Sequence, residues 1–393
     1  MHEALLRETI EHLAGIERPA CSAGEREAAE WLAARLSVLG CEARVEEEAA
    51  YADFALPIAE LCGLGVAGGL AVLRGRRASG GLLAVVAGTL IADDVSNGPR
   101  LFRRLTMRRR PTWNVVATTG DRSAERTLVV LAHHDAAPTG LVFDQSAQRR
   151  LWERFPGVIE RMNTSIPLWW LVFGPPLAVG VGAVLGRRRL VGLATGLGAL
   201  SVATMLDIAR SPVVPGANDN LTGVAGLVGL ARAFEERPVD GLRVVLASCG
   251  AEETLQGGIH GFAARHFPSL PINRTWFVNL DTVGSPHLVL LEGEGPVVME
   301  DYEAGFKDLI AEVAAAAGVA LRRGLRSRNS TDSVIPSRAG YPVGTIVSIT
   351  DWKALANYHW PSDVPENVEY ETVEQAVRLT EAVARRLAVD AAA

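Results

Sequence analysis

The sequence lacks the cysteine pattern that would indicate a disulfide framework or a cysteine-rich metal site. It has only four cysteines in 393 residues, Cys21, Cys41, Cys62 and Cys249, and none of them form a CxxC pair. We therefore interpret them as small, buried hydrophobic residues in a reducing compartment, with a Cys21–Cys41 disulfide as the alternative.

The sequence also has no basic excess and no recognisable secretory leader. Its formal net charge is −6, and charged residues make up 21% of the chain, so no nucleic-acid partner is expected. The first residues, MHEALLRETIEHLAG, are amphipathic and acidic. A signal peptide would instead begin with basic residues and continue into an apolar run.

Apolar residues, at 48% of the chain, are abundant and concentrated in four segments that form two pairs. Residues 61–73 and 78–92 contain 13 and 15 uncharged residues, and Arg74, Arg76 and Arg77 lie between them. Residues 162–186 and 190–206 contain 25 and 17 uncharged residues, and they are separated by Arg187, Arg188 and Arg189. Since a membrane-spanning helix needs about 20 apolar residues, the third segment qualifies, the fourth is borderline and the first two are short.

We interpret the two pairs as helical hairpins that pack together as one membrane-embedded bundle, with arginine-rich tips at a polar interface. The protein would then be a multi-pass membrane protein that contacts the lipid bilayer through these hairpins. The alternative is a set of helical hairpins buried inside a soluble protein. The three arginines at each tip favour cytoplasmic tips and an external enzyme. Arginines are more numerous on the enzyme side of the hairpins, however, and together with the missing leader they favour a cytoplasmic catalytic domain.

The rest of the chain alternates between strand-like and helix-like patterns. This alternation predicts an α/β fold with a mixed, mostly parallel central sheet flanked by helices. Strands are expected at residues 41–48, 114–118, 127–132, 242–247, 275–280 and 344–349, and helices at 3–16, 24–39, 221–234, 302–317 and 371–387.

Metal-ligand side chains follow several of these strands. Glu252 and Glu253 come after the buried strand 242–247, and at such a strand end one glutamate can hold a metal while its neighbour moves a proton. His133 and Asp135 follow a second strand, and Asp281 follows a third. Each motif alone is more often an ordinary turn or helix cap.

Two further residues complete the set, since Asp219 precedes a helix and His359 lies in a late loop. Two imidazoles and three carboxylates are the ligand inventory of two zinc ions that share a bridging carboxylate. The His-x-Asp spacing lets Asp135 orient the imidazole of His133.

The ordered motifs AHHD, GANDN, GAEE, NLDTVG and YHWPSD resemble the M28 family of co-catalytic zinc peptidases, the aminopeptidase and glutamate carboxypeptidase group. This resemblance implies a zinc exopeptidase fold, two Zn²⁺ ions and aminopeptidase-like hydrolysis of a peptide substrate. His133, Asp219 and Asp281 would hold one zinc, and Glu253, His359 and the shared Asp219 the other.

The resemblance also implies roles for residues beside the ligands. Glu252 would be the general base, Asp135 an orienting carboxylate and Tyr358 a hydrogen-bond donor to the tetrahedral intermediate. The Asp219–Asn220 peptide bond would be cis. One departure is Thr331-Asp332-Ser333, where the family often has Ser-Asp-His.

The resemblance defines the expected domains. Residues 1–50, 112–140 and 212–393 would form the peptidase domain, and residues 51–111 and 141–211 the two inserted hydrophobic hairpins. The related M20 carboxypeptidases and dipeptidases have a similar ligand order, but only 78 residues separate Asp281 from His359, which leaves little room for their extra domain.

Three further classes stay open at this point. A glutaminyl-cyclase-like acyltransferase would use a single zinc, and His133 argues against it. A non-catalytic membrane scaffold would typically have lost ligands, whereas all five are present. A transporter is disfavoured because the apolar segments contain little polar chemistry.

Overall fold

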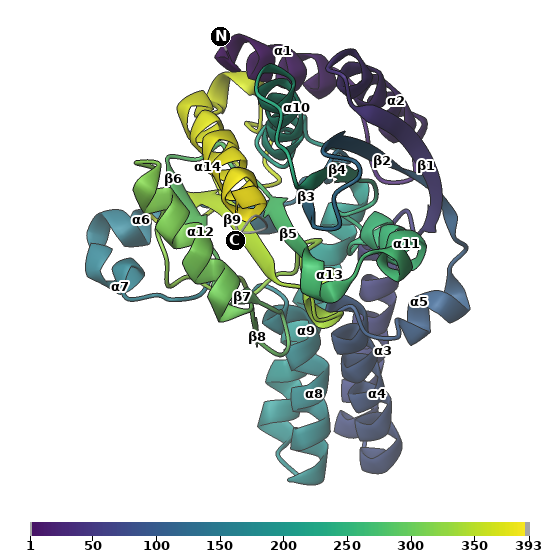
Figure 1. The fold of residues 1–393 in the computed structure, drawn as a ribbon. Helices are drawn as coiled ribbons and strands as arrows, with labels where there is room; N and C mark the ends of the chain where they lie inside the picture. Colours follow the sequence, from purple (N-terminus) through teal and green to yellow (C-terminus); the bar gives the residue numbers. More distant parts are fainter. Residues whose placement is uncertain (1, 390–393) are drawn as a thin grey trace.

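The computed structural model describes residues 2–389 and is organised around a seven-stranded sheet (Figure 1). The strand order is β1-β2-β4-β3-β5-β9-β6. The strands are β1 (Glu42–Ala50), β2 (Arg110–Gly120), β3 (Thr127–His133), β4 (Arg243–Cys249), β5 (Thr275–Leu280), β6 (His287–Leu290) and β9 (Val343–Ile349). A short antiparallel pair, β7 (Gly293–Glu294) with β8 (Glu300–Asp301), lies outside this sheet.

The sheet is mixed, as predicted, because its centre is parallel and its margins are antiparallel. Strands β4, β3, β5 and β9 pair in parallel, while β1, β2 and β6 run antiparallel to their neighbours. Every residue of β3 and β9 is buried, as expected of strands rich in Val, Leu and Ile that are covered on both faces. The carboxyl ends of the four parallel strands therefore meet at one edge of the sheet.

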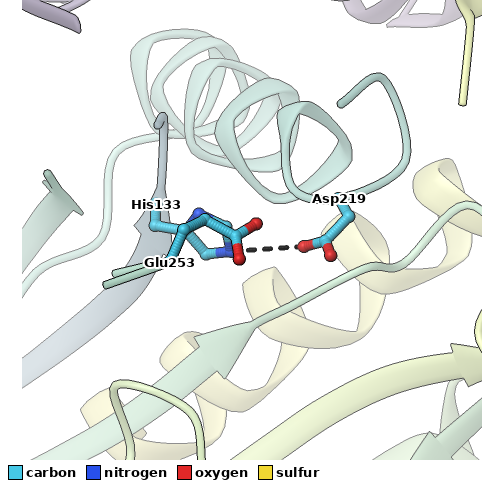
Figure 2. A group of neighbouring side chains, drawn as sticks. All are labelled: His133, Asp219 and Glu253. Carbon is cyan, nitrogen blue, oxygen red and sulfur yellow. Dashed lines mark ion pairs between the residues drawn. The ribbon is translucent and has the colours of Figure 1, made fainter. Parts of the chain in front are cut away.

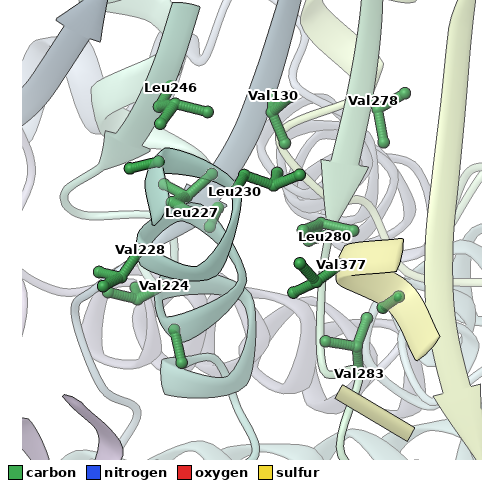
Figure 3. Packing of buried hydrophobic residues seen from close by; sticks show 14 of the residues in the cluster. Val130, Val224, Leu227, Val228, Leu230, Leu246, Val278, Leu280, Val283 and Val377 are labelled. Atoms are coloured by element: carbon green, nitrogen blue, oxygen red, sulfur yellow. The ribbon is translucent and has the colours of Figure 1, made fainter. Parts of the chain in front are cut away.

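Helices cover both faces of the sheet. Those with side chains in the larger hydrophobic core are α1 (His2–Ala14), α2 (Ala23–Val38), α10 (Leu221–Glu236), α12 (Ala304–Ala316) and α14 (Tyr370–Val389). Figure 3 shows Leu227 and Leu230 of α10 packed toward Leu246 and Val130 of the sheet. The opposite face packs against α11 (Gly257–His266), with α13 (Val334–Arg338) beside that helix.

The two apolar insertions form one bundle that projects from the sheet domain (Figure 1). It consists of α3 (Ala55–Leu73), α4 (Arg77–Val95), α8 (Trp170–Val184) and α9 (Arg188–Arg210). The two arginine-rich turns lie at the same distal end, where Arg188 Nη2 donates to the carbonyl of Leu73 at 2.7 Å.

Glycines let these helices approach closely. A Cβ atom on Gly68 of α3 would lie 2.6 Å from the carbonyl oxygen of Gly80 of α4, and one on Gly80 would lie 2.5 Å from that of Gly68. Such backbone contact is typical of helix pairs in membranes, where small residues at the interface provide close van der Waals packing.

The sequence ranked the four apolar segments wrongly by their ability to span a membrane. Helices α3, α4 and α9, with 19, 19 and 23 residues, are long and apolar enough to cross a membrane, whereas α8 has only 15 residues. Residues 162–169 carry no charge, but they contain Pro167 and pair with another loop, because Arg326 N donates to Asn163 O at 2.9 Å. Conversely, α3 and α4 extend past the uncharged runs and include Glu60, Asp93 and Asp94.

Smaller elements join the bundle to the sheet domain. The helix α5 (Leu101–Thr106) follows α4, and η1 (Leu141–Phe143), α6 (Ser146–Arg154) and α7 (Pro156–Glu160) precede α8. Among the described residues all four cysteines are free, and Cys41, Cys62 and Cys249 are buried.

Candidate metal centre

The proposed ligands lie together at the carboxyl edge of the parallel strands. His133 is the last residue of β3, Glu252 and Glu253 follow β4, and Asp281 follows β5. Asp219 lies just before α10, and His359 comes from the loop between β9 and α14. Residues distant in the sequence converge here because parallel strands end side by side.

The carboxylate of Asp219 lies between two imidazoles. Its Oδ1 is 3.3 Å from His133 Nε2, and its Oδ2 is 3.3 Å from His359 Nε2. Figure 2 shows Asp219 facing His133, with Glu253 beside that ring. Each oxygen therefore faces a different ring nitrogen, which is the arrangement of a carboxylate that can bridge two cations.

Three further carboxylates surround this bridge. Glu253 Oε2 is 3.1 Å from His359 Nε2, and Glu252 Oε2 is 3.9 Å from His133 Nε2. Single ligand atoms of His133, Asp219 and Glu253 all lie within 4.8 Å of one another. Asp281 is linked to Asp219 through Thr282, whose hydroxyl lies 2.9 Å from Asp281 Oδ1 and 3.3 Å from Asp219 Oδ1.

Asp135 organises both the imidazole and the paired glutamates. Its Oδ1 lies 3.5 Å from His133 Nδ1, so it can orient that ring. The backbone N–H groups of Glu252 and Glu253 donate to its two oxygens at 3.1 Å each. One buried carboxylate therefore fixes the positions of a histidine and of the Glu-Glu turn.

The loop that carries Asp219 is held by residues that the sequence analysis missed. Asp363 accepts hydrogen bonds from the backbone N–H groups of Asn218 and Asp219, at 2.7 and 3.1 Å. The buried Arg18 donates to the carbonyls of His134 and Gly216, at 2.8 and 3.0 Å. The Asp219–Asn220 peptide bond is cis, as the resemblance implied.

The Glu-Glu turn is supported by two further residues. Glu25 accepts from the N–H of Ala251 at 2.7 Å and from the Thr112 hydroxyl at 2.8 Å. The Gln256 amide donates to Glu252 Oε1 at 2.7 Å and to the carbonyl of Ser330 at 3.0 Å. Neither role was indicated by the sequence, because these contacts join segments far apart in the chain.

Polar side chains from the end of α4 and from α5 bind the same turn. The buried Arg103 pairs with Asp94 at 2.8 Å and donates to the carbonyl of Thr254 at 2.9 Å. Arg100 donates to the carbonyl of Leu255, and Asn97 Nδ2 donates to Gln256 Oε1 at 2.6 Å. The bundle is thus connected to Glu252 by a continuous series of hydrogen bonds through Gln256.

Burial and the clustered carboxylates shift the pKa values of the site. Burial raises the pKa of Glu252 well above its ordinary value, although nearby His133 lowers it. For His359 burial opposes protonation, but Glu253 and Asp219 outweigh it and raise the pKa to about 10. The ligand-type groups thus form a strongly electronegative cluster that favours bound cations.

The unsatisfied polar atoms of the cluster fit a metal site. Glu253 Oε1 and His359 Nε2 are buried and make no hydrogen bond of normal geometry, although His359 Nε2 lies 3.1 Å from Glu253 Oε2. Each such atom costs about 1–3 kcal/mol when left unsatisfied. Nitrogen and carboxylate oxygen atoms converging in a buried pocket are suitable ligands for zinc, which would satisfy the inward-facing ones.

The backbone around the cluster is strained at several positions. Ala251, Thr282 and His359 adopt φ values of 50°, 54° and 50°, in the left-handed region that non-glycine residues rarely enter. Such residues gather at functional sites, where the surrounding structure enforces them.

Tyr358 and Phe143 form an aromatic wall beside His359. The ring centroids of Tyr358 and His359 are 3.9 Å apart and nearly parallel, and Phe143 meets His359 edge-on at 4.5 Å. Burial and neighbouring carboxylates raise the pKa of Tyr358 well above its ordinary value, so its hydroxyl stays protonated and able to donate. Phe143 belongs to η1, so the second insertion borders the site at its base.

The fold is a mixed α/β sheet flanked by helices, and it is similar to the fold of zinc exopeptidases. The model of peptidase family M28 matches residues 198–384, which confirms the resemblance given by the motifs. This range includes Asp219, Glu253, Asp281 and His359 and begins after His133. No curated protein matches the chain.

Solved structures with the same fold come from two enzyme types. BSAP, a zinc aminopeptidase from Bacillus subtilis, is 14% identical with a TM-score of 0.54, covering 97% of this chain and 94% of that chain. An aminopeptidase from Aneurinibacillus sp. strain AM-1 is 15% identical with a TM-score of 0.54, and the match covers 97% of this chain and 92% of that chain. Tannerella forsythia glutaminyl cyclase is 14% identical with a TM-score of 0.55, covering 98% of both chains.

Proposed function

We propose that this protein is a membrane-embedded zinc peptidase that hydrolyses terminal peptide bonds in the manner of an aminopeptidase. The observation that carries this proposal is the carboxylate of Asp219, whose two oxygens each lie 3.3 Å from a different imidazole. His133, Asp219 and Asp281 would hold one zinc, and Asp219, Glu253 and His359 the other.

The chain's own residues would divide the catalytic work. Zinc bound here would polarise the scissile carbonyl and lower the pKa of a bound water. Glu252, which lies 3.9 Å from His133 Nε2, would accept a proton from the attacking water and deliver it to the leaving amine. The protonated hydroxyl of Tyr358 would donate a hydrogen bond to the carbonyl oxygen as negative charge develops there.

Two further features of the proposal concern the domains and the membrane. Residues 1–50, 112–140 and 212–393 would form the peptidase domain, and α3, α4, α8 and α9 would lie in the bilayer with that domain on the cytoplasmic side. In sealed, inside-out vesicles, added protease should then spare the Arg187–Arg189 turn and cut loops of the peptidase domain. Cleavage at that turn would reverse the orientation.

A panel of small peptides tests the activity. The purified protein, supplied with zinc, should release the first residue of peptides with a free N-terminus and leave N-terminally blocked peptides intact. Release of the last residue instead would indicate a carboxypeptidase.

A glutaminyl-cyclase-like activity is the second candidate, because a glutaminyl cyclase has the same fold at equal similarity. Peptides with N-terminal glutamine separate the two functions. Conversion to a pyroglutamyl product without cleavage of other peptides would favour the cyclase.

A further inference from the structure

Two cavities of different character meet at the candidate metal centre. The larger, of about 370 Å³, extends from Glu252, Glu253 and His359 along the space between α8 and α9. The smaller, of about 260 Å³, contains His133, Asp219 and Asp281. Tyr358, Phe143 and both glutamates line the two cavities in common. A substrate whose reacting bond lies at the metal centre can therefore extend in two directions.

The larger cavity forms an apolar groove along the bundle. On α9 its lining extends from Leu190 to Ile208, which is about 27 Å along the helix axis at ~1.5 Å per residue. Along the bundle its walls are mainly Leu, Val, Ala, Met, Ile, Trp, Phe and Pro side chains, together with the hydroxyl-bearing Ser201 and Thr204. Other polar residues line the end at the metal centre, where Glu252 and Glu253 are the only carboxylates among the described lining residues. The Ser201 hydroxyl is already used, because it donates to the carbonyl of Leu171 at 2.7 Å.

The groove is open along its side. Leu171, Leu193 and Leu200 line it and are nevertheless 62%, 64% and 63% exposed. These leucines lie on the outside of a bundle in which three helices are long and apolar enough to cross a membrane. In a bilayer this opening would face lipid tails, so an apolar ligand could enter sideways from the membrane.

The smaller cavity contains more polar side chains than the groove, beside apolar ones such as Leu291, Leu325 and Val347. Asp144, Gln145, Gln148 and Lys353 line it. The Lys353 ammonium lies at its rim and donates to the carbonyls of Glu160 and Met162, at 2.9 and 2.6 Å. The two cavities thus provide an apolar side and a more polar side at one reaction centre.

We propose that the groove binds a single long aliphatic chain attached next to the scissile amide. The substrates would then be amphipathic amides, with the chain between α8 and α9 and the polar part in the smaller cavity. This inference rests on the proposed amide hydrolysis and adds its substrate class.

The chemistry of the groove favours an aliphatic chain over a peptide. An extended peptide would leave its backbone N–H and C=O groups unpaired against an apolar wall, which is costly. A hydrocarbon chain has no such groups.

Chain-length dependence tests the proposal with the full protein in lipid nanodiscs. Two series separate the possible sources of the chain. Leucine N-alkylamides carry it on the amine side and keep the free N-terminus that the proposed function requires. N-acyl leucines carry it on the acyl side, and hydrolysis of these blocked substrates would replace the aminopeptidase activity with that of an acylase. In at least one series kcat/KM should rise by at least ~10-fold from butyl to dodecyl, since each buried methylene favours binding. Equal kcat/KM at all lengths, with short peptides still cleaved, would overturn the inference and leave the proposed function intact.

Two groove variants and one control give the position of the chain. Ala178 lines the groove on α8, whereas Ala199 of α9 is exposed and does not line it. Ala178→Phe should lower kcat/KM about 10-fold for the longest chains only, and Ala199→Phe should not. Thr204 lies closer to the metal centre on α9. Thr204→Phe should therefore affect shorter chains as well. Identical chain-length profiles for all three variants would contradict the proposal.

A binding experiment keeps the test independent of turnover. A hexadecanoyl amide with a photoreactive diazirine at its chain end should label α8 and α9 in metal-free protein, and an unlabelled long-chain amide should compete. Labelling confined to outward residues such as Leu82 and Val86, without competition, would overturn the inference. If no peptide or amide is hydrolysed but competed labelling occurs, the proposed function fails while the groove assignment stands.

Discussion

Two apolar helices of this protein, α10 and α9, have similar compositions and different surroundings. Both are rich in Leu, Val, Ala and Gly, but α10 is buried between the sheet, α1 and α14 along nearly its whole length. In α9, Leu193, Leu197 and Leu200 are 64%, 44% and 63% exposed. Apolar surface exposed to water costs about 25 cal/mol per Å². The protein core removes this cost for α10, whereas the exposed face of α9 would be stabilised by a bilayer.

The ligand cluster and the apolar groove likewise belong to different parts of the molecule. The described ligand cluster lies at a strand end and in loops of the sheet domain, whereas the bundle contributes most of the apolar groove. Asn97 and Arg103, in the segment that follows α4, donate hydrogen bonds to the Glu252–Gln256 turn. Catalysis and membrane attachment should therefore respond to different substitutions, with Gln256 at their junction.

The largest effect is expected at Glu252. Glu252→Gln should retain the bound zinc and lower turnover by ~10²–10⁴, because the side chain can no longer accept a proton. Glu253→Gln is the contrasting variant, which should lose metal as well as activity. Turnover and metal content of the two purified variants check this, and loss of metal in Glu252→Gln would make Glu252 structural.

A smaller effect on activity is expected at the junction of the two regions. Gln256→Ala removes the donor to Glu252 and the acceptor for Asn97, and should lower kcat/KM by about 10–100-fold. Loss of that donor raises the pKa of Glu252, since a hydrogen bond to a carboxylate favours its charged form. The acidic limb of the pH profile of kcat/KM should move to higher pH, and an unchanged profile would show that Gln256 does not act on the base.

The next effect is on the free energy of unfolding and not on the reaction, because it concerns packing within the bundle. Gly68→Val should destabilise the protein by about 1–3 kcal/mol, because its side chain would press against the backbone of α4. Gly63→Val is the matched control on the same helix, since a Cβ there meets nothing within 4 Å. Thermal unfolding in detergent should separate the two variants, and equal melting temperatures would argue against tight α3–α4 packing.

The last effect is a gradual pH dependence of stability at Glu294 of β7, which involves neither the reaction nor the bundle. Burial raises the pKa of this carboxyl to about 8 in the folded protein. Between the ordinary glutamate pKa, about 4.3, and 8 the unfolded chain is ionised while the folded one is protonated, so stability falls as pH rises through this window. The loss is at most about 1.4 kcal/mol per pH unit. Glu294→Gln should show a flatter decline of melting temperature between pH 5 and 8, and parallel curves would contradict this.

The sheet and the proposed ligands could be predicted because their signals are local. Buried strands such as Thr127–His133 are short runs of Val and Leu, and their carboxyl ends meet in any parallel sheet. Ligand-type residues at several strand ends were therefore expected to converge, and the structure brings His133, Asp219, Glu252, Glu253 and His359 together.

Other features had no local signal. The contacts of Arg18, Asp363 and Gln256 join segments far apart in the chain and leave no spacing pattern. The ranking of the apolar segments failed because absence of charge does not specify a helix: Pro167 and the pairing of residues 163–165 with Arg326 keep the start of the third segment out of α8.

The most direct test of the account is the number and position of bound zinc ions. Crystals of the zinc-loaded protein, with anomalous scattering recorded at the zinc edge, should show two peaks on either side of the Asp219 carboxylate, roughly 3.5–4 Å apart. One peak should lie beside His133 and the other beside His359. A single peak, or peaks away from Asp219, would contradict the two-metal site.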